Sequence, residues 1–169
     1  MKKQKAFTLI ELLVTFSITA LLMIAISSLL LTFLATAYKS RISQSLRESG
    51  DNAMKQIVEM IRSSSDITSA CVKDAPLNAL TLVGRDGLTT VIKEEDDRIA
   101  SVSASKKTYL TESGANSNYV SNLIFKCYPT SENKKYIKIN FTLHTGDNTA
   151  SSSARSTTLD FGSGIVTRN

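Results

Sequence analysis

The distribution of apolar residues divides the chain into three regions, and the first is an apolar run over residues 7–38. No charged residue occurs from Leu12 to Tyr38. At about 1.5 Å rise per residue, a helix of this length can cross a hydrocarbon core about 30 Å thick. Glu11 interrupts the run, and a carboxylate in lipid costs about 2.5 kcal/mol or more, which marks it as a functional residue by default. The pattern therefore predicts a membrane-spanning helix with a functional acid near its start.

In the second region, residues 39–66, the helical pattern becomes amphipathic. Gly50 leaves a gap in this pattern, and since glycine costs about 1 kcal/mol against alanine in a helix, we expect a bend there. The serine cluster that precedes Asp66 predicts the end of the helix. One face is then expected to pack on a sheet while the other meets water. The apolar positions recur at mostly helical spacing: Tyr38, Ile42, Leu46, Ala53, Ile57 and Ile61.

The third region, residues 67–169, alternates apolar and polar residues as antiparallel strands do. A connection that contains Cys71 and Pro76 precedes the strands, and a turn at Gly84–Gly87 predicts a hairpin. The resulting fold class is α+β, with one long N-terminal helix packed on an antiparallel sheet. The expected strands are 78–83, 88–93, 98–102, 119–128, 135–145 and 155–166, and the expected loops are 103–107, 111–118 and 146–153.

The positive charge of the chain is concentrated at its start. The formal net charge is +5, and Lys2, Lys3 and Lys5 precede the apolar run, which leaves 5 − 3 = +2 from Phe7 onward. The charge is therefore a weak argument for nucleic-acid binding. Lysines before an apolar helix predict a cytoplasmic N-terminus and an extracytoplasmic C-terminal domain.

Two cysteines, Cys71 and Cys127, lie in the part expected outside the cytoplasm. An isolated pair in an oxidising compartment predicts a disulfide, which would stabilise the domain by about 3–5 kcal/mol in the entropic model. A metal site is not expected, because His144 is the only histidine and no Cys-x-x-Cys spacing occurs. No cofactor is predicted.

The start of the chain resembles the N-terminus of type IV prepilins and type II secretion pseudopilins. The resemblance is carried by Lys5-Ala6, then Phe7-Thr8-Leu9-Ile10-Glu11, then the apolar run. It implies cleavage between Ala6 and Phe7 by a leader peptidase, N-methylation of Phe7, and pairing of Glu11 with the Phe7 amine of a neighbouring subunit. Such a pair would relieve the desolvation of both charges. Ala6 is a departure, since the family usually has glycine there.

The same resemblance implies how the chain is organised and used. Residues 1–6 would be the leader, 7–38 the transmembrane and assembly helix, 39–66 its amphipathic half and 67–169 the β domain. The layout resembles the larger minor pilins and minor pseudopilins, which are structural subunits and not enzymes. The implied partners are other subunits, the prepilin peptidase and methyltransferase, and an inner-membrane assembly platform. The implied location is the inner membrane as a single-pass protein, then a filament, the cell surface or the periplasm.

The N-terminus also allows other interpretations. A secretory signal peptide cut after Ala35-Thr36-Ala37 would have an apolar region about twice the normal 7–15 residues, with Glu11 inside it. A plain signal anchor leaves Glu11 unexplained. A buried helix of a soluble protein would be unusually long. A membrane-tethered domain that never polymerises remains an alternative function.

The remaining candidate chemistry lies in the β region. Four consecutive acids at Glu94–Asp97 suggest calcium, but they cannot all point at one ion, so we expect a solvated turn. His144 has no partner by spacing and is expected on a sheet surface. Two lysine pairs with nearby tyrosines, the arrangement that holds single-stranded nucleic acid, make a DNA- or surface-binding competence or adhesion subunit the second alternative. These residues are Lys106, Lys107, Lys134, Lys135, Tyr109, Tyr128 and Tyr136.

Overall fold

The computed structural model describes residues 8–104, 106–111, 118–130, 134–145 and 157–167. One long helix, α1 (Leu9–Ser63), is followed by strands that pair only antiparallel within this described part, which confirms the expected α+β class. The chain divides into two compact units with the boundary between Arg41 and Ile42. The strands are β1 (Asp66–Ile67), β2 (Pro76–Leu77), β3 (Ala79–Val83), β4 (Thr89–Glu95), β5 (Arg98–Ser103), β6 (Lys106–Tyr109), β7 (Tyr119–Pro129), β8 (Lys135–Thr145) and β9 (Thr157–Val166).

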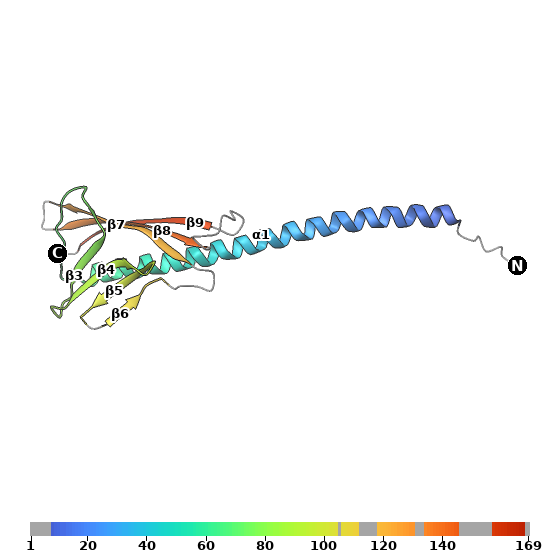
Figure 1. The fold of residues 1–169 in the computed structure, drawn as a ribbon. Coiled ribbons are helices and arrows are strands. Elements are labelled where there is room, and N and C mark those ends of the chain that lie inside the picture. Colours follow the sequence, from blue (N-terminus) through green and yellow to red (C-terminus); the bar gives the residue numbers. More distant parts are fainter. Residues whose placement is uncertain (1–7, 105, 112–117, 131–133, 146–156, 168–169) are drawn as a thin grey trace. The chain divides into compact units, whose positions relative to one another are not determined.

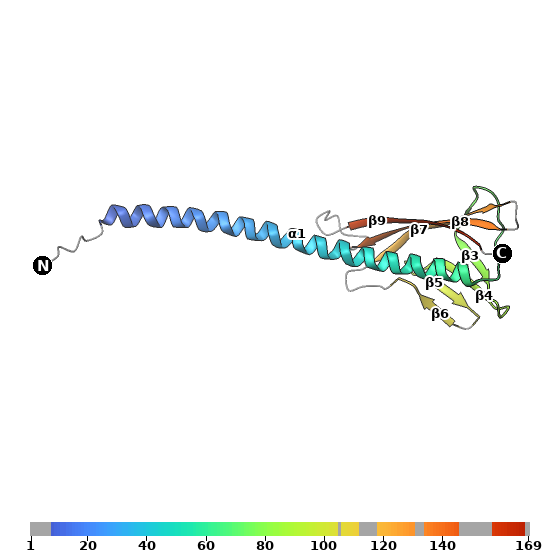
Figure 2. The same ribbon diagram turned by 180° about the vertical axis from the view of Figure 1, so that it is seen from behind.

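The second unit contains two sheets, where the sequence predicted one. The first has five strands in the order β1-β3-β4-β5-β6, and the second has four in the order β2-β7-β8-β9. In Figures 1 and 2, β7–β9 lie along one side of the C-terminal part of α1 and β4–β6 lie along the other. The backbone N–H of Val120 in β7 donates to the carbonyl of Asp97, between β4 and β5, at 2.8 Å. The two sheets are therefore joined by backbone bonding as well as by packing.

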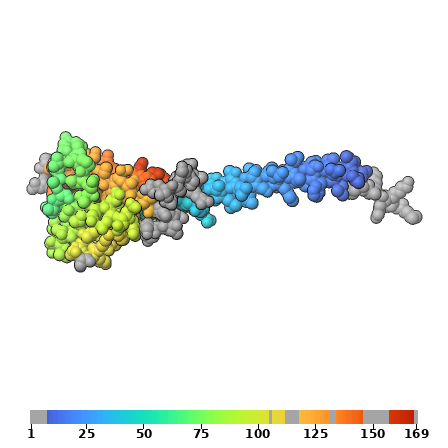
Figure 3. Space-filling view, in the orientation of Figure 1, coloured from blue at the N-terminus to red at the C-terminus, as the bar shows by residue number. Residues whose placement is uncertain are grey.

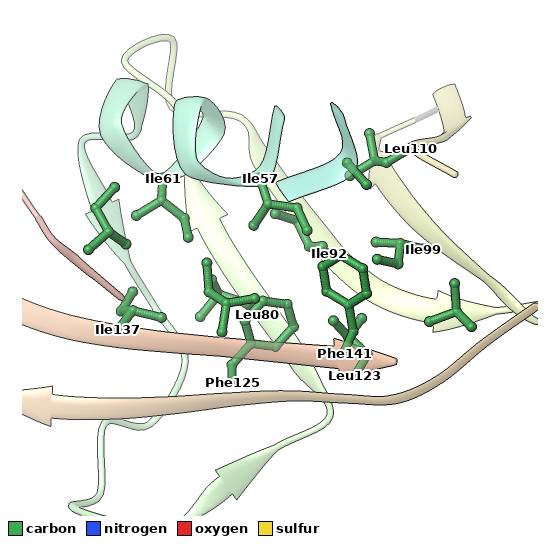
Figure 4. Packing of buried hydrophobic residues seen from close by; sticks show 14 of the residues in the cluster. Ile57, Ile61, Leu80, Ile92, Ile99, Leu110, Leu123, Phe125, Ile137 and Phe141 are labelled. Carbon is green, nitrogen blue, oxygen red and sulfur yellow. The ribbon is translucent and has the colours of Figure 1, made fainter. Parts of the chain in front are cut away.

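The buried apolar residues that the structure describes form one hydrophobic core between the C-terminal part of α1 and the two sheets (Figure 4). The helix contributes every third or fourth residue from Leu46 to Ile61, and the strands contribute alternate residues, as their two periodicities require. Burying such side chains is worth about 1.5–3 kcal/mol each. The largest fully buried side chains are Phe125, Phe141, Leu46, Ile57, Ile61, Leu80, Ile92, Ile99, Ile137, Ile139, Leu143 and Val120.

Gly50 belongs to this core, although the sequence pattern predicted a bend at it. The α-helix continues through Gly50, which is buried together with Leu46 and Ala53. A Cβ atom at this position would overlap the ring of Phe161 in β9. The glycine therefore allows α1 and β9 to approach closely and fills the gap in the apolar face. The helix ends at Ser63, within the predicted serine cluster.

The strands differ from the prediction mainly at their ends and edges. The expected loop at 103–107 overlaps the start of β6, and the connection at 67–78 includes the second residue of β1 and all of β2. Of the acidic run, Glu94 and Glu95 belong to β4, and only Asp96 and Asp97 form the turn. Both turn residues have positive φ (53° and 57°), which is the geometry of a two-residue type I′ hairpin. The run is therefore half strand and half turn.

The disulfide joins Cys71, in the connection between β1 and β2, to Cys127 in β7. Their Cα atoms are 5.0 Å apart, and the bond spans 56 residues of sequence. Cys127 is buried at 1% exposure. The expected pairing is present, and it ties the segment that follows α1 to β7, one of the two inner strands of the second sheet.

Candidate functional site

The candidate site is the first turn of α1, which begins with a capped helix terminus. Thr8 lies immediately before the helix, and its carbonyl accepts the N–H groups of Glu11 at 3.1 Å and Leu12 at 3.2 Å. Its hydroxyl accepts the Glu11 N–H as well, at 3.3 Å. Thr-x-x-Glu at a helix start is the capping-box sequence, which the hydrophobic pattern alone does not reveal. Thr8 therefore fixes where the helix starts and places Glu11 in its first turn.

Glu11 is the chemically distinct residue of this segment. The positive end of the helix dipole favours a carboxylate in the first turn. Among the residues that the structure describes, however, none forms a hydrogen bond or an ion pair with the Glu11 carboxylate. The capping box is thus only half formed, because the bond from Thr8 is present and the return bond from the Glu11 side chain is not. A carboxylate held at a helix start without a partner is available to a group from another molecule.

Every hydroxyl between Leu9 and Ala37, in contrast, is satisfied inside the helix. Each donates to a backbone carbonyl three or four residues earlier at 2.8–3.0 Å, which is how such side chains are accommodated where water is absent. The apolar span therefore presents no unsatisfied polar side chain except Glu11. The residues are Thr15, Ser17, Thr19, Ser27, Ser28, Thr32 and Thr36.

The surface of this segment is apolar on all sides. All residues from Thr8 to Thr36 are exposed, and Figure 3 shows this segment in blue. By length and composition, α1 is able to cross a membrane. Large apolar surfaces of this kind are normally covered by lipid or by other proteins. The helix therefore has the character of a membrane anchor and of a helix that packs with others.

The predicted processing residues, Ala6 and Phe7, lie outside the described residues. The structure does describe Glu11. It also describes Thr8, three residues earlier, to which the sequence pattern assigned no separate role. Cys71 and Cys127 lie in the second unit, where they form the disulfide. The site at the start of α1 therefore rests on Thr8, Glu11 and the apolar helix.

The lysine–tyrosine patch considered for nucleic acid does not form as one surface. The Lys107 ammonium lies 2.7 Å from the Glu95 carboxylate and 3.1 Å from that of Asp96. These contacts lower the pKa of Glu95, mainly through Lys107 and then Lys93, and that of Asp96, mainly through the Tyr109 hydroxyl and then Lys107. Lys135 belongs to β8 in the four-stranded sheet, and its ammonium lies 3.0 Å from the Asp66 carboxylate. One lysine of each pair, Lys107 or Lys135, is therefore neutralised by a carboxylate. The acidic run Glu94–Asp97 binds lysine through Glu95 and Asp96.

His144 has partners that sequence spacing did not indicate. On the outer face of the second sheet its Nε2 lies 2.7 Å from the Ser121 hydroxyl and its Nδ1 lies 3.1 Å from that of Thr158. The Tyr119 ring stacks on the imidazole, with centroids 4.6 Å apart. These residues come from β7, β8 and β9, so only the strand register could have predicted the cluster. A hydroxyl occupies the position that a carboxylate has in a catalytic triad, so the cluster lacks the orienting acid of that arrangement.

Comparison with known proteins identifies the N-terminal segment. Residues 1–27 match the family model described as the prokaryotic N-terminal methylation motif. Neither the curated proteins nor the solved structures gave a match. The matched residues include the capped helix start, the free Glu11 carboxylate and the first part of the apolar span. This match supports the likeness of the N-terminal segment to the start of type IV prepilins and pseudopilins.

Proposed function

We propose that this chain is a minor structural subunit of a type IV pilus or type II secretion-like filament, joined to its neighbours through its N-terminal helix. The observation that supports this most strongly is Glu11, the one polar side chain between Leu9 and Ala37 that lacks a partner among the described residues. In a membrane, a carboxylate close to the interface can still reach water or headgroups. In the apolar centre of a filament that route is closed, so only a cation from another subunit can satisfy it.

The cation that we propose is the methylated amine of Phe7 from a neighbouring subunit. Cleavage between Ala6 and Phe7 would create this amine by removing the leader, residues 1–6. Pairing with Glu11 would then favour one axial register, because any other register leaves two buried charges unpaired. The satisfied hydroxyls of the span support this proposal, since they leave no other polar group to compete for the amine.

We propose the same domain boundaries as the sequence predicted. Residues 7–38 would form the transmembrane and assembly helix, 39–66 the amphipathic half and 67–169 the extracytoplasmic β domain. The N-terminus would lie in the cytoplasm, because Lys2, Lys3 and Lys5 precede the apolar run. The disulfide supports the outward placement of the β domain, since disulfides persist in oxidising compartments.

The experiment that tests this function is N-terminal mass analysis of the chain recovered from the sheared filament fraction of cells. We expect a mature chain that begins at N-methylated Phe7 and is enriched with other subunits that carry the same motif. An uncleaved chain confined to the membrane would favour the tethered, non-polymerising alternative. A chain that begins at Tyr38 would show that ordinary signal peptidase removes the helix.

A further inference from the structure

The last strand of the second sheet, β9, is a long edge that no other described residue is seen to protect in the usual ways. β9 has ten residues, and none of the described strands pairs with its outer side. The other sheet edges are β1 and β2, of two residues each, and β6, of four residues that begin with two lysines. Short edges and edge lysines are common means of preventing strand addition. β9 contains neither lysine nor proline, so it differs from the other edges in the described part of the chain.

The direction of the free backbone groups follows from the register with β8. The N–H of Thr167 donates to the carbonyl of Lys135 at 2.9 Å, and the register continues without a bulge to the pair Thr145 and Thr157. Antiparallel strands alternate between residues bonded to the partner and residues bonded away from it. The residues that direct N–H and C=O groups to the open side are therefore the even-numbered ones, and all of them are exposed: Thr158, Asp160, Gly162, Gly164 and Val166.

Gly164 is the point where side chains from β8 reach this edge. A Cβ at Gly164 would overlap the Tyr136 hydroxyl, so that phenol lies directly over the glycine. Lys138 is the residue paired with Gly164 across the strands, and it in turn is paired with Lys126. Like charges directly opposite are destabilising, and within the described residues neither lysine has an ion pair. The edge at Gly164 therefore has the Tyr136 hydroxyl as a possible donor. Lys138 and, one strand further away, Lys126 have no anionic partner among the described residues.

We propose that β9 accepts an extended segment of another polypeptide as an added strand, and that this segment carries an aspartate or glutamate opposite Gly164. Its backbone would bond to the free groups of Gly162 and Gly164, which supplies most of the affinity in this mode of recognition. A side chain opposite Gly164 would share a face with Tyr136 and Lys138. Its backbone would lie two strand spacings, about 10 Å, from that of Lys138, a distance that an extended lysine and a carboxylate bridge together.

The segment must be acidic at this one position. The Tyr136 phenol lies over Gly164, so its hydroxyl can donate to the carboxylate. The exposed Lys138 on the same face, which has no ion pair among the described residues, supplies positive charge next to it. Further along the edge, Asp160 is already bound through one oxygen by the Thr142 hydroxyl at 2.7 Å and would disfavour a second acid. The surface thus selects a strand with one acid and otherwise uncharged or basic residues. The proposal stands independently of assembly through Glu11.

Fluorescence anisotropy with the full chain in detergent micelles tests this directly. The probe is a labelled peptide of about nine residues, a usual strand length, that alternates threonine and valine around one central glutamate. One control peptide has lysine at the centre, and another has consecutive N-methylated amides, which cannot pair on either edge. We expect saturable binding of the glutamate peptide, weaker binding of the lysine peptide by about two- to fivefold, and no binding of the N-methylated peptide.

Substitutions in the chain locate the binding. Lys138→Glu should reverse the preference between the two peptides, and Tyr136→Phe should weaken only the glutamate peptide. Lys106→Glu, an exposed lysine on the edge of the other sheet, changes the net charge equally and should have no effect. Gly162→Pro removes an N–H that points to the open side of β9 and breaks no hydrogen bond to β8, so it should abolish binding. The N-methylated peptide tests the need for backbone hydrogen bonds on the unaltered protein.

The results that would overturn the proposal are equally specific. Absence of saturable binding by any peptide would exclude strand addition. Binding of the N-methylated peptide would show that the contact does not use backbone pairing. Equal losses from Lys106→Glu and Lys138→Glu would show that only net charge matters and that β9 is not the site.

Discussion

The ring of Phe161 in β9 lies directly against Gly50 in α1, where a Cβ atom would overlap it. The ring also stacks on Phe141 in β8, with centroids 5.1 Å apart and planes 17° apart, so it is held from a second side. This contact sets how closely the helix approaches the second sheet. It explains why the buried face of α1 contains the residue with the lowest helix propensity apart from proline.

We therefore expect Gly50→Ala to destabilise the second unit. Overpacking costs about 1–3 kcal/mol, and we expect the upper part of this range, about 2–3 kcal/mol, because the Cβ would overlap several atoms of the Phe161 ring. Alanine recovers about 1 kcal/mol of helix propensity, so the free energy of unfolding should fall by about 1–2 kcal/mol. Urea unfolding of the full chain in detergent, followed through the β-sheet signal, measures the change.

Two further variants show whether the Phe161 ring is the cause. Ser45→Ala, an exposed position of the same helix, should change the free energy by less than about 0.5 kcal/mol. Phe161→Leu should be less damaging in the Gly50→Ala background than in the wild type, because the two residues are in contact. An unchanged or raised stability of Gly50→Ala would contradict the proposed close approach.

The contact also shows which features of the buried face of α1 the sequence could predict. The periodic residues Leu46, Ala53, Ile57 and Ile61 predicted the buried face of the helix, because burial of an amphipathic helix follows its 3.6-residue period. Gly50 fits the same period but carries no side chain, so only its neighbour in β9 reveals its role. The exposure of Tyr38 shows that this face does not begin as early as predicted.

Among the strands, those with alternating apolar residues were predicted well. β8 has the predicted bounds, Lys135–Thr145. β6 was missed because its sequence is polar and it is held by backbone pairing at an edge. In β7, a bulge near Asn122, with a φ of 57°, places Val120 and Leu123 both inward at a spacing of three. The division into two sheets depends on contacts between distant segments and leaves no local signal.

Reduction of the Cys71–Cys127 disulfide should lower the free energy of unfolding by about 4 kcal/mol in the loop-entropy model for this span. The reason is that the unfolded chain gains freedom when the cross-link is removed. Urea unfolding with and without reductant measures this loss, and intact-mass analysis after alkylation without reductant reports on the bond itself. Two alkylated cysteines in native, aerobically purified protein would contradict the pairing.

The Lys107 cluster predicts a stability difference that depends on pH. The pKa values of Glu95 and Asp96 are lower in the folded chain than in the unfolded chain, so their contribution is present above about pH 4 and is lost as pH falls through the folded values. Lys107→Gln should therefore be less stable than wild type at pH 7, and the difference should shrink towards pH 3. Unfolding curves at both pH values measure it.

The neighbouring lysine provides the control for this prediction. Lys106→Gln removes the same charge from the same strand, but no described acid is paired with Lys106. Its stability relative to wild type should show no comparable change between pH 7 and pH 3. A Lys107→Gln difference that stays constant over this range would contradict the assigned cause.

The candidate site was only partly predictable. Glu11 was identified because a charge in an apolar run is energetically costly, and that reasoning needs no structure. Thr8 is part of a Thr-x-x-Glu sequence, which is typical of helix starts. The hydrophobic pattern does not include this signal. The partners of His144 required the pairing of β7 with β8 and of β8 with β9, which sequence spacing does not provide.

The most direct test of assembly through Glu11 is co-purification of Glu11→Gln with sheared filaments, at membrane levels equal to wild type. The substitution keeps the shape of the side chain and removes its charge. Ser17→Ala is the matched control, since it removes a hydroxyl already satisfied within the helix. Loss of one partner of a buried charge pair costs about 3–5 kcal/mol, so the incorporated fraction of Glu11→Gln should fall by about tenfold or more while Ser17→Ala incorporates normally. Incorporation of Glu11→Gln at the wild-type level would contradict the account.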